Sequence, residues 1–289
     1  MASSQSIRVC APAKVNLFLE VLGKRLDGYH EIVTVMQRVS LHDVLTFEPT
    51  DSGIEITCTD PSIPTDRGNL VWRAVEALQR QCGGCWGCRV AIDKRIPPGS
   101  GLGGGSSDAA ATLRAANELW SLGLDASALG QMAAGLGSDV PFFLGPPTAV
   151  CRGRGEIVEP VAAAAPFHYV LVMPGLHVST AEVYKRLAPS LTARREDVNV
   201  LTTSLVAGDP EQVGAHLFNR LETPAFAMHP ELGERLKELA GLGVCGARMS
   251  GSGSASFALC RDAQHASDIQ ARVQAEGWGL VAVAATERT

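Results

Sequence analysis

Residues 97–111 read Pro97-Pro98-Gly99-Ser100-Gly101-Leu102-Gly103-Gly104-Gly105-Ser106-Ser107-Asp108-Ala109-Ala110-Ala111. A glycine-rich loop therefore leads directly into a strong helix-forming stretch. Glycine lets the main chain approach a ligand closely, and the first turn of a helix leaves N–H groups without intrahelical partners. Those donors and the positive end of the helix dipole attract an anion. We expect a phosphate site rather than a flexible linker, because a linker seldom begins with two prolines and ends inside a helix cap.

The loop matches neither common type of phosphate loop. Gly99, Gly101 and Gly104 have the G-x-G-x-x-G spacing, but a second helical stretch over 125–134 follows where a dinucleotide fold needs a parallel strand. A Walker loop is excluded because no Gly-Lys-Ser or Gly-Lys-Thr closes the run. The protein-kinase motifs His-Arg-Asp and Asp-Phe-Gly are also absent from the sequence. Ser106 and Ser107 are expected to cap a helix that continues over 109–117. The loop therefore predicts a different kind of nucleotide cradle.

Composition limits the class of protein. The chain has 289 residues, of which 46% are hydrophobic and 19% charged, so we expect two globular domains. A net charge of −5 argues against a nucleic-acid partner, which normally requires a basic surface. No secretory segment opens the chain, and prolines interrupt the longest uncharged run, 160–181. We expect a cytoplasmic protein without a membrane partner.

Cysteine spacing gives no metal site. Cys82, Cys85 and Cys88 resemble part of an iron–sulfur ligand set, but Ile92 stands where the fourth ligand would fall. Cys151, Cys245 and Cys260 are too scattered to complete a zinc ribbon. Reduced thiols in a loop are the expected state.

Hydrophobic patterns predict an α+β chain. Strands are expected over 8–22 (broken by Pro12), 31–48, 89–96, 169–173, 246–250, 256–260 and 279–283, with a hairpin over 148–160. Helices are expected over 69–81, 180–187, 230–240 and 263–275. A linker at 161–166 divides an N-terminal nucleotide-binding domain, 1–162, from a C-terminal substrate-binding domain, 163–289. The expected active site is a cleft between the two.

Three motifs in order resemble those of the GHMP kinases, which phosphorylate galactose, homoserine, mevalonate and related small molecules with ATP. They are Pro12-Ala13-Lys14-Val15-Asn16-Leu17, the loop at 97–111, and Ser250-Gly251-Ser252-Gly253. Further strings resemble one branch, whose substrate is CDP-methylerythritol in non-mevalonate isoprenoid biosynthesis. These are Arg25-Leu26-Asp27-Gly28-Tyr29-His30, Asp66-Arg67-Gly68-Asn69-Leu70, Gly137-Ser138-Asp139-Val140-Pro141-Phe142-Phe143, and Asn219-Arg220-Leu221-Glu222. The resemblance implies ATP-dependent phosphorylation of the substrate's 2-hydroxyl.

The chemistry implied by the resemblance assigns two catalytic residues. Asp139 fits the acceptor of the hydroxyl proton, and Lys14 fits the cation that stabilises the developing negative charge. Without the resemblance, Asp139 could equally cap a short helix before Pro141, and Lys14 would more often be a surface lysine on an edge strand. We expect the two side chains to converge on one oxygen atom.

The resemblance also implies the substrate-binding residues. Asn16 lies on the same side of an extended chain as Lys14, close to the reacting groups. Tyr29 would stack on the cytosine ring and His30 would bond its edge, although His30 alone would be interpreted as a turn residue. Thr180 and Tyr184, one helical turn apart, would form a second wall of this pocket.

The remaining implied residues bind the nucleotide. Asn69 and Lys94 would lie near the adenosine, and residues from Pro97 and Pro98 through Gly99 to Ser107 would cradle the phosphates. ATP would bring Mg²⁺, for which Ser107 is a candidate ligand beside Asp108 or water. The turn at 250–254 would line the cleft near a substrate phosphate, or be an ordinary loop between strands.

Two alternatives stay open at this point. A related GHMP kinase acting on homoserine or a mevalonate derivative would not need Tyr29 and His30, because those substrates carry no base. A non-catalytic sensor of nucleotide and sugar would not need both Lys14 and Asp139. We expect a monomer or a weak homodimer.

Overall fold

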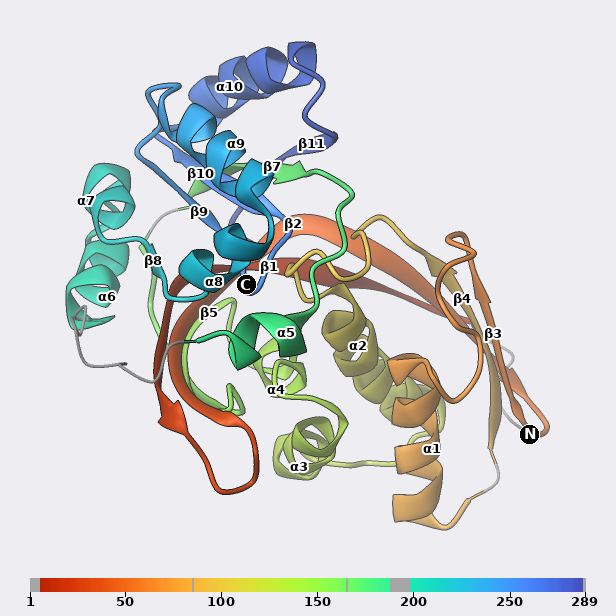
Figure 1. Ribbon diagram of the computed structural model, residues 1–289. Helices are drawn as coiled ribbons and strands as arrows, with labels where there is room; N and C mark the ends of the chain where they lie inside the picture. Colours follow the sequence, from red (N-terminus) through yellow and green to blue (C-terminus); the bar gives the residue numbers. More distant parts are fainter. Residues whose placement is uncertain (1–5, 85, 165, 188–197, 288–289) are drawn as a thin grey trace. The chain divides into compact units, whose positions relative to one another are not determined.

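The computed structural model describes residues 6–84, 86–164, 166–187 and 198–287 (Figure 1). The chain divides into two compact units, each built from separate segments. Unit 1 comprises residues 1–13, 42–98 and 103–145, and unit 2 comprises residues 14–41, 99–102 and 146–289. The strands β1 (Ile7–Lys24) and β2 (His30–Thr50) therefore supply residues to both units. The domain boundary expected after residue 162 stays a prediction.

Unit 1 is a sheet covered by helices. Its further elements are β3 (Ile54–Cys58), α1 (Leu70–Cys82), β4 (Gly87–Asp93), α2 (Gly104–Leu119), α3 (Ala126–Leu136) and α4 (Val140–Leu144). The final part of β2 pairs antiparallel with β4, with Val44 opposite Asp93 and Thr50 opposite Gly87, and β3 runs parallel to β4.

The core of unit 1 forms where α1 and α2 pack against this sheet (Figure 1). Val71 and Val75 of α1 and Ala111 of α2 meet strand residues such as Phe47 and Val90. The small alanine side chains of α2 let the helix lie close to the sheet. The amphipathic helix expected over 69–81 is confirmed.

Unit 2 contains a second sheet with strand order β11-β7-β10-β9, antiparallel throughout. Its elements after residue 145 are β5 (Thr148–Gly153), β6 (Ile157–Pro160), β7 (His168–Met173), α5 (Thr180–Lys185), α6 (Val198–Ala207), α7 (Pro210–Ala215), β8 (Phe218–Asn219), α8 (Glu222–Met228), α9 (Pro230–Ala240), β9 (Gly246–Met249), β10 (Ser256–Cys260), α10 (Ala263–Ala275) and β11 (Leu280–Ala285). Helices α9 and α10 cover one face of this sheet, with Leu236 and Ile269 in the shared core (Figure 1).

The later part of β1, from residue 14 onward, belongs to unit 2 with the first part of β2 and with β5, β6 and β8. Strand β8 pairs parallel with β1, placing Phe18 opposite Phe218 and Leu19 opposite Asn219. The first part of β2 pairs antiparallel with β5, which forms the expected hairpin with β6. Residues 14–21 of β1 are all buried, so polar side chains in this segment need partners inside the protein.

The α+β class is confirmed, and two local expectations are wrong. Pro12 does not break the first strand, since it lies within β1, which is 18 residues long and uninterrupted. Proline is tolerated there because residues 7–13 lie at a sheet edge, where a missing N–H interrupts no central ladder. Ser106 and Ser107 do not cap α2, because the helix begins earlier and Gly103 occupies the N-cap position.

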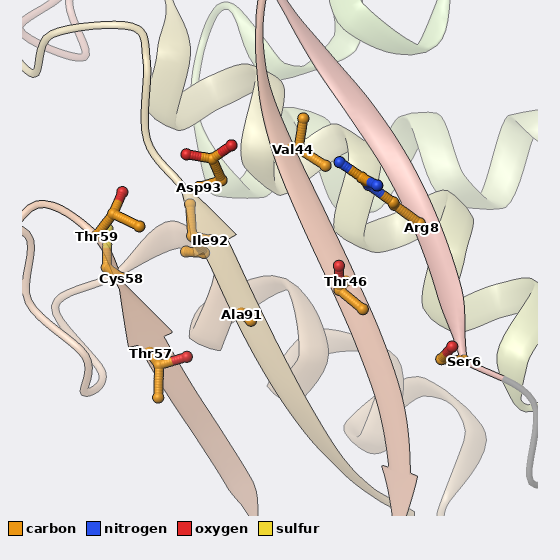
Figure 2. A pocket seen from close by; sticks show the side chains of 10 residues that line it. All are labelled: Ser6, Arg8, Val44, Thr46, Thr57, Cys58, Thr59, Ala91, Ile92 and Asp93. Atoms are coloured by element: carbon orange, nitrogen blue, oxygen red, sulfur yellow. The ribbon is translucent and has the colours of Figure 1, made fainter.

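A hollow of about 570 Å³ lies on the strand face of unit 1 (Figure 2). Arg8, Thr46, Thr57 and Asp93 are among the side chains around it. None of the predicted site residues is among its lining residues.

Within the described ranges, no helix has the length and apolar character needed to cross a membrane.

Candidate active site

Lys14 forms hydrogen bonds to a carbonyl and an amide oxygen inside unit 2. It lies in the fully buried part of β1, and only 3% of its surface is exposed. Its ammonium donates to the carbonyl oxygen of Gly101 at 2.8 Å and to Oδ1 of Asn16. The alternative of a surface lysine is therefore wrong. A buried ammonium oriented by hydrogen bonds is a compact positive charge that can act on an anion.

Asn16 has its side-chain amide fixed from both ends. Oδ1 accepts from Lys14, and Nδ2 donates to the hydroxyl of Thr34 at 2.9 Å. That hydroxyl donates in turn to the carbonyl oxygen of Phe18 at 2.6 Å. The expected placement of Asn16 on the same side as Lys14 is confirmed. The pattern did not predict Thr34, whose only sequence signal is a hydroxyl inside an apolar strand.

The second small-residue cluster lies beside this pair. Ser250 donates from Oγ to the carbonyl oxygen of Gly101 at 2.9 Å, and the N–H of Gly253 donates back to the carbonyl of Ser250 at 3.0 Å, closing a turn. Gly251 has φ +57°, and a Cβ there would lie 3.5 Å from Nζ of Lys14. The turn thus leaves main chain, not side chain, next to the ammonium.

The expected pyrimidine-binding residues come from two elements of unit 2. His30 begins β2 and Tyr184 lies on α5, and their rings face each other with centroids 4.9 Å apart. Tyr29, in the preceding turn, is half exposed, and the guanidinium of Arg154 lies over its ring at 4.6 Å. Burial, assisted by the charge of Lys24, lowers the pKa of His30 below its ordinary value. A neutral imidazole offers one donor and one acceptor.

Thr180 links the same wall to the serine–glycine turn. It is the first residue of α5, which Ser179 caps by accepting from the N–H of Glu182. Its hydroxyl lies 2.7 Å from the hydroxyl of Ser252, at hydrogen-bond distance. The helical spacing expected for Thr180 and Tyr184 is confirmed by α5.

The start of α2 in unit 1 is open to an anion. Gly103, at the N-cap position, has φ +73° and supplies no side-chain cap. The donors of the first turn therefore have no capping side chain. Ser107 lies one turn further along, with only 1% of its surface exposed, and its Oγ has no hydrogen-bond partner among the described residues.

Lys94 takes part in a buried charge cluster of unit 1. Its ammonium lies 2.5 Å from a carboxylate oxygen of Asp43 and 2.8 Å from one of Asp108. The other oxygen of Asp43 accepts from the N–H groups of Arg95 and Ile96. Burial raises the pKa of Asp108 to about 7, against the opposing effect of Lys94. Asp43 was not predicted, although a lone acid in an apolar strand is a recognisable signal.

Two further predicted residues stand at helix starts of unit 1. Asn69 caps α1, because its Oδ1 accepts from the N–H of Val71 and its Nδ2 donates to the carbonyl of Pro64. Asp139 occupies the N-cap position of α4, yet its side chain makes no capping hydrogen bond. The capping alternative for the Asp139 carboxylate is therefore not supported. Lys14 and Asp139 belong to different units, and their convergence stays a prediction.

Models of known families match both halves of the chain. The GHMP kinases N-terminal domain matches residues 69–145, and the GHMP kinases C-terminal domain matches residues 201–277. The first match includes the glycine loop and Asp139, and the second includes the turn at 250–253.

Relatives and solved structures match over nearly the whole chain. A protein of Pelotomaculum thermopropionicum named 4-diphosphocytidyl-2-C-methyl-D-erythritol kinase is 43% identical, covering 92% of this chain and 93% of its own. A protein of the same name from Geobacter sp. is 41% identical, covering 96% and 99%. A crystal structure of 4-(cytidine 5'-diphospho)-2C-methyl-D-erythritol kinase has a TM-score of 0.84 and 39% identity, covering 98% of this chain and 100% of that one. Homoserine kinase from Cytophaga hutchinsonii, at 20% identity and a TM-score of 0.75, shares the fold. The chain therefore belongs to the GHMP kinase family and is a small-molecule kinase.

Proposed function

We propose that this protein transfers the γ-phosphoryl group of ATP to the 2-hydroxyl of 4-diphosphocytidyl-2-C-methyl-D-erythritol. Curated relatives of that name, about 40% identical over most of the chain, support this substrate. Members of the family are ATP-dependent phosphotransferases, so ATP is the donor. We further propose that it acts in the cytoplasm as a monomer or weak homodimer, without a nucleic-acid partner, in keeping with a net charge of −5.

The buried ammonium of Lys14 is the observation that carries the proposal. Phosphoryl transfer needs an oriented hydroxyl, compensation of negative charge and an acceptor for the hydroxyl proton. Lys14, oriented by Gly101 and Asn16, supplies the positive charge. Asp139 takes the proton as the new P–O bond forms, a role that suits a carboxylate not used in helix capping.

The substrate end of the site is assigned to unit 2. Tyr29 and Tyr184 supply aromatic faces for the pyrimidine, and neutral His30 supplies a donor and an acceptor for its polar edge. Thr180 and Asn16 bind polar groups of the methylerythritol part. A homoserine or mevalonate substrate has no base to use the three rings, so these alternatives are less well supported.

The nucleotide end is assigned to the glycine loop and unit 1. Main-chain donors from Gly99 to Ser107 hold the phosphates, with the first turn of α2 at their centre. The polar atoms of Asn69 and Lys94 are committed to protein partners, so we assign both residues to shaping the adenosine side rather than to hydrogen bonds with the base.

Mg²⁺ is proposed to accompany ATP. The hydroxyl of Ser107 fits a ligand of this ion, because it is buried and its Oγ has no partner among the described residues. Bound Mg²⁺ would neutralise charge on the phosphates. Ser107→Ala should then weaken Mg²⁺-dependent ATP binding, measured calorimetrically, more than binding of ATP without the ion.

Release of ADP tests the proposed reaction. Purified protein with Mg-ATP is given the CDP-alcohol, homoserine or mevalonate in separate reactions. Of the three substrates, only the CDP-alcohol is expected to be turned over. Turnover with either of the others would move the protein to a different GHMP activity, and binding of the CDP-alcohol without ADP release would favour the sensor.

A further inference from the structure

Asn219 holds the serine–glycine turn of unit 2 with its side-chain NH2 group. It lies at the end of β8 and is 4% exposed. Its Nδ2 donates to the carbonyl oxygen of Met249 at 2.7 Å and to that of Gly251 at 2.8 Å. Its Oδ1 accepts from the N–H of Leu221 at 2.9 Å. The two carbonyls flank Ser250, so Asn219 fixes the main chain on both sides of that residue.

Glu222 holds the same segment from the start of α8. Its Oε1 accepts from the N–H of Met249 at 2.9 Å. Burial raises the pKa of Glu222, while this hydrogen bond and the charge of Arg248 act in the opposite direction. Two side chains three positions apart in the sequence, Asn219 and Glu222, therefore bind three main-chain groups around Ser250.

Arg220 connects the same motif to the strand that carries Lys14. Its guanidinium forms a two-point ion pair with the buried carboxylate of Glu20, with N–O distances of 2.7 and 2.6 Å. Its main-chain N–H donates to the carbonyl of Leu19 at 2.8 Å. Such a planar pair fixes direction as well as distance. The motif 219–222 is thereby anchored to β1.

We propose that Asn219 and Glu222 are positioning residues that orient the ammonium of Lys14 through Ser250 and Gly101. The order of contacts is continuous: Asn219 and Glu222 fix the main chain beside Ser250, the hydroxyl of Ser250 donates to the carbonyl of Gly101, and Lys14 donates to the same carbonyl. Neither positioning residue needs to touch substrate. The expected effect of these two residues on catalysis rests on the proposed function, whereas their effect on the structure of the serine–glycine turn does not.

Amide hydrogen exchange without substrates tests the structural half. In Asn219→Leu, the N–H groups of Ser250 and Gly253 should exchange about tenfold faster or more, while amides within α9 keep their rates. Glu222→Leu should have the same local effect. Glu222→Gln, which keeps an acceptor for the Met249 amide, should retain slow exchange. The exposed Asn199→Leu is the matched control. Unchanged exchange at both amides in Asn219→Leu and Glu222→Leu would overturn the inference.

Steady-state kinetics tests the catalytic half. Asn219→Leu should lower kcat about 10- to 100-fold, with KM for ATP and the CDP-alcohol within about threefold of the parent. In a Lys14→Met background the same change should lower kcat by less than about twofold, because the group being positioned is gone. Independent, multiplicative losses would overturn the positioning role. If the unaltered protein fails to turn over the CDP-alcohol, the proposed function fails, and the exchange experiment still decides the role of Asn219 in the turn.

Discussion

Lys14 donates to the main-chain carbonyl of Gly101 at 2.8 Å, although the two lie 87 positions apart in the sequence. A carbonyl and an amide oxygen orient the ammonium. In unit 1, the ammonium of the other buried lysine, Lys94, lies between two carboxylates. We predict different uses for the two buried lysines: Lys14 acts on an anion, while Lys94 stabilises its surroundings.

Lys14→Met tests the first use. The substitution keeps most of the side-chain volume and removes the charge, so kcat should fall about 10²- to 10³-fold. Unfolding by denaturant should show that the variant is folded under assay conditions. Lys237→Met, at an exposed position of α9, is the control and should keep full turnover. A Lys14→Met enzyme with ordinary kcat would remove Lys14 from the mechanism.

Asp139→Asn tests the proton acceptor. The amide cannot take the hydroxyl proton, so turnover should fall about 10²- to 10⁴-fold. Affinity for ATP, measured by calorimetry, should be nearly unchanged because Asp139 is not among the residues assigned to the phosphate cradle. Asp268→Asn on the exposed face of α10 serves as the control. Near-normal turnover of Asp139→Asn would refute the assignment.

Binding of the CDP-alcohol should weaken in acid because of His30. The pKa of His30 is lowered in the folded protein, first by burial and then by the charge of Lys24, so the ring is neutral at pH 7. As the pH falls below 6.5 and through this lowered pKa, protonation removes the ring's acceptor. KM for the CDP-alcohol should rise there, and stability should fall with the same sign because the unfolded state binds the proton more readily. His30→Gln should flatten the KM profile. A KM that stays constant in acid for the parent protein would contradict the role.

Lys94→Met tests the buried charge cluster. Removal of the ammonium leaves the carboxylates of Asp43 and Asp108 buried without their cation. The free energy of unfolding should fall by about 3–5 kcal/mol. Denaturant titration measures the loss, with Lys237→Met expected to lie within about 0.5 kcal/mol of the parent. A loss no larger than that of the control would mean that the cluster does not stabilise unit 1.

Elements with local signals were predictable from sequence. Helices α9 and α10 have the expected bounds, because Pro230 marks one start and Asp262 caps the other. The sequence did not predict α6, whose residues include valines and threonines with low helix propensity. Burial of Leu201 and Leu205 stabilises that helix instead, and this depends on tertiary packing.

The candidate site was predictable in its residue types and not in its contacts. Lys14 and the turn at 250–253 were recognisable as motifs. Their meeting at Gly101 depends on pairing between distant segments, which no local pattern encodes. Asn219 belongs to a motif that was recognised in the sequence, but its own role could not be derived. Its partners, the main-chain carbonyls of Met249 and Gly251, carry no sequence signal.

Close packing at Gly101 has a consequence for how such sequences can change over time. Gly101 has φ +80°, and a Cβ there would lie 2.1 Å from the carbonyl oxygen of Ser250. No larger residue can therefore replace Gly101 unless the main chain at Ser250 moves away. Divergence in the glycine loop and in the later turn must be concerted, and lineages that alter one should carry compensating substitutions in the other.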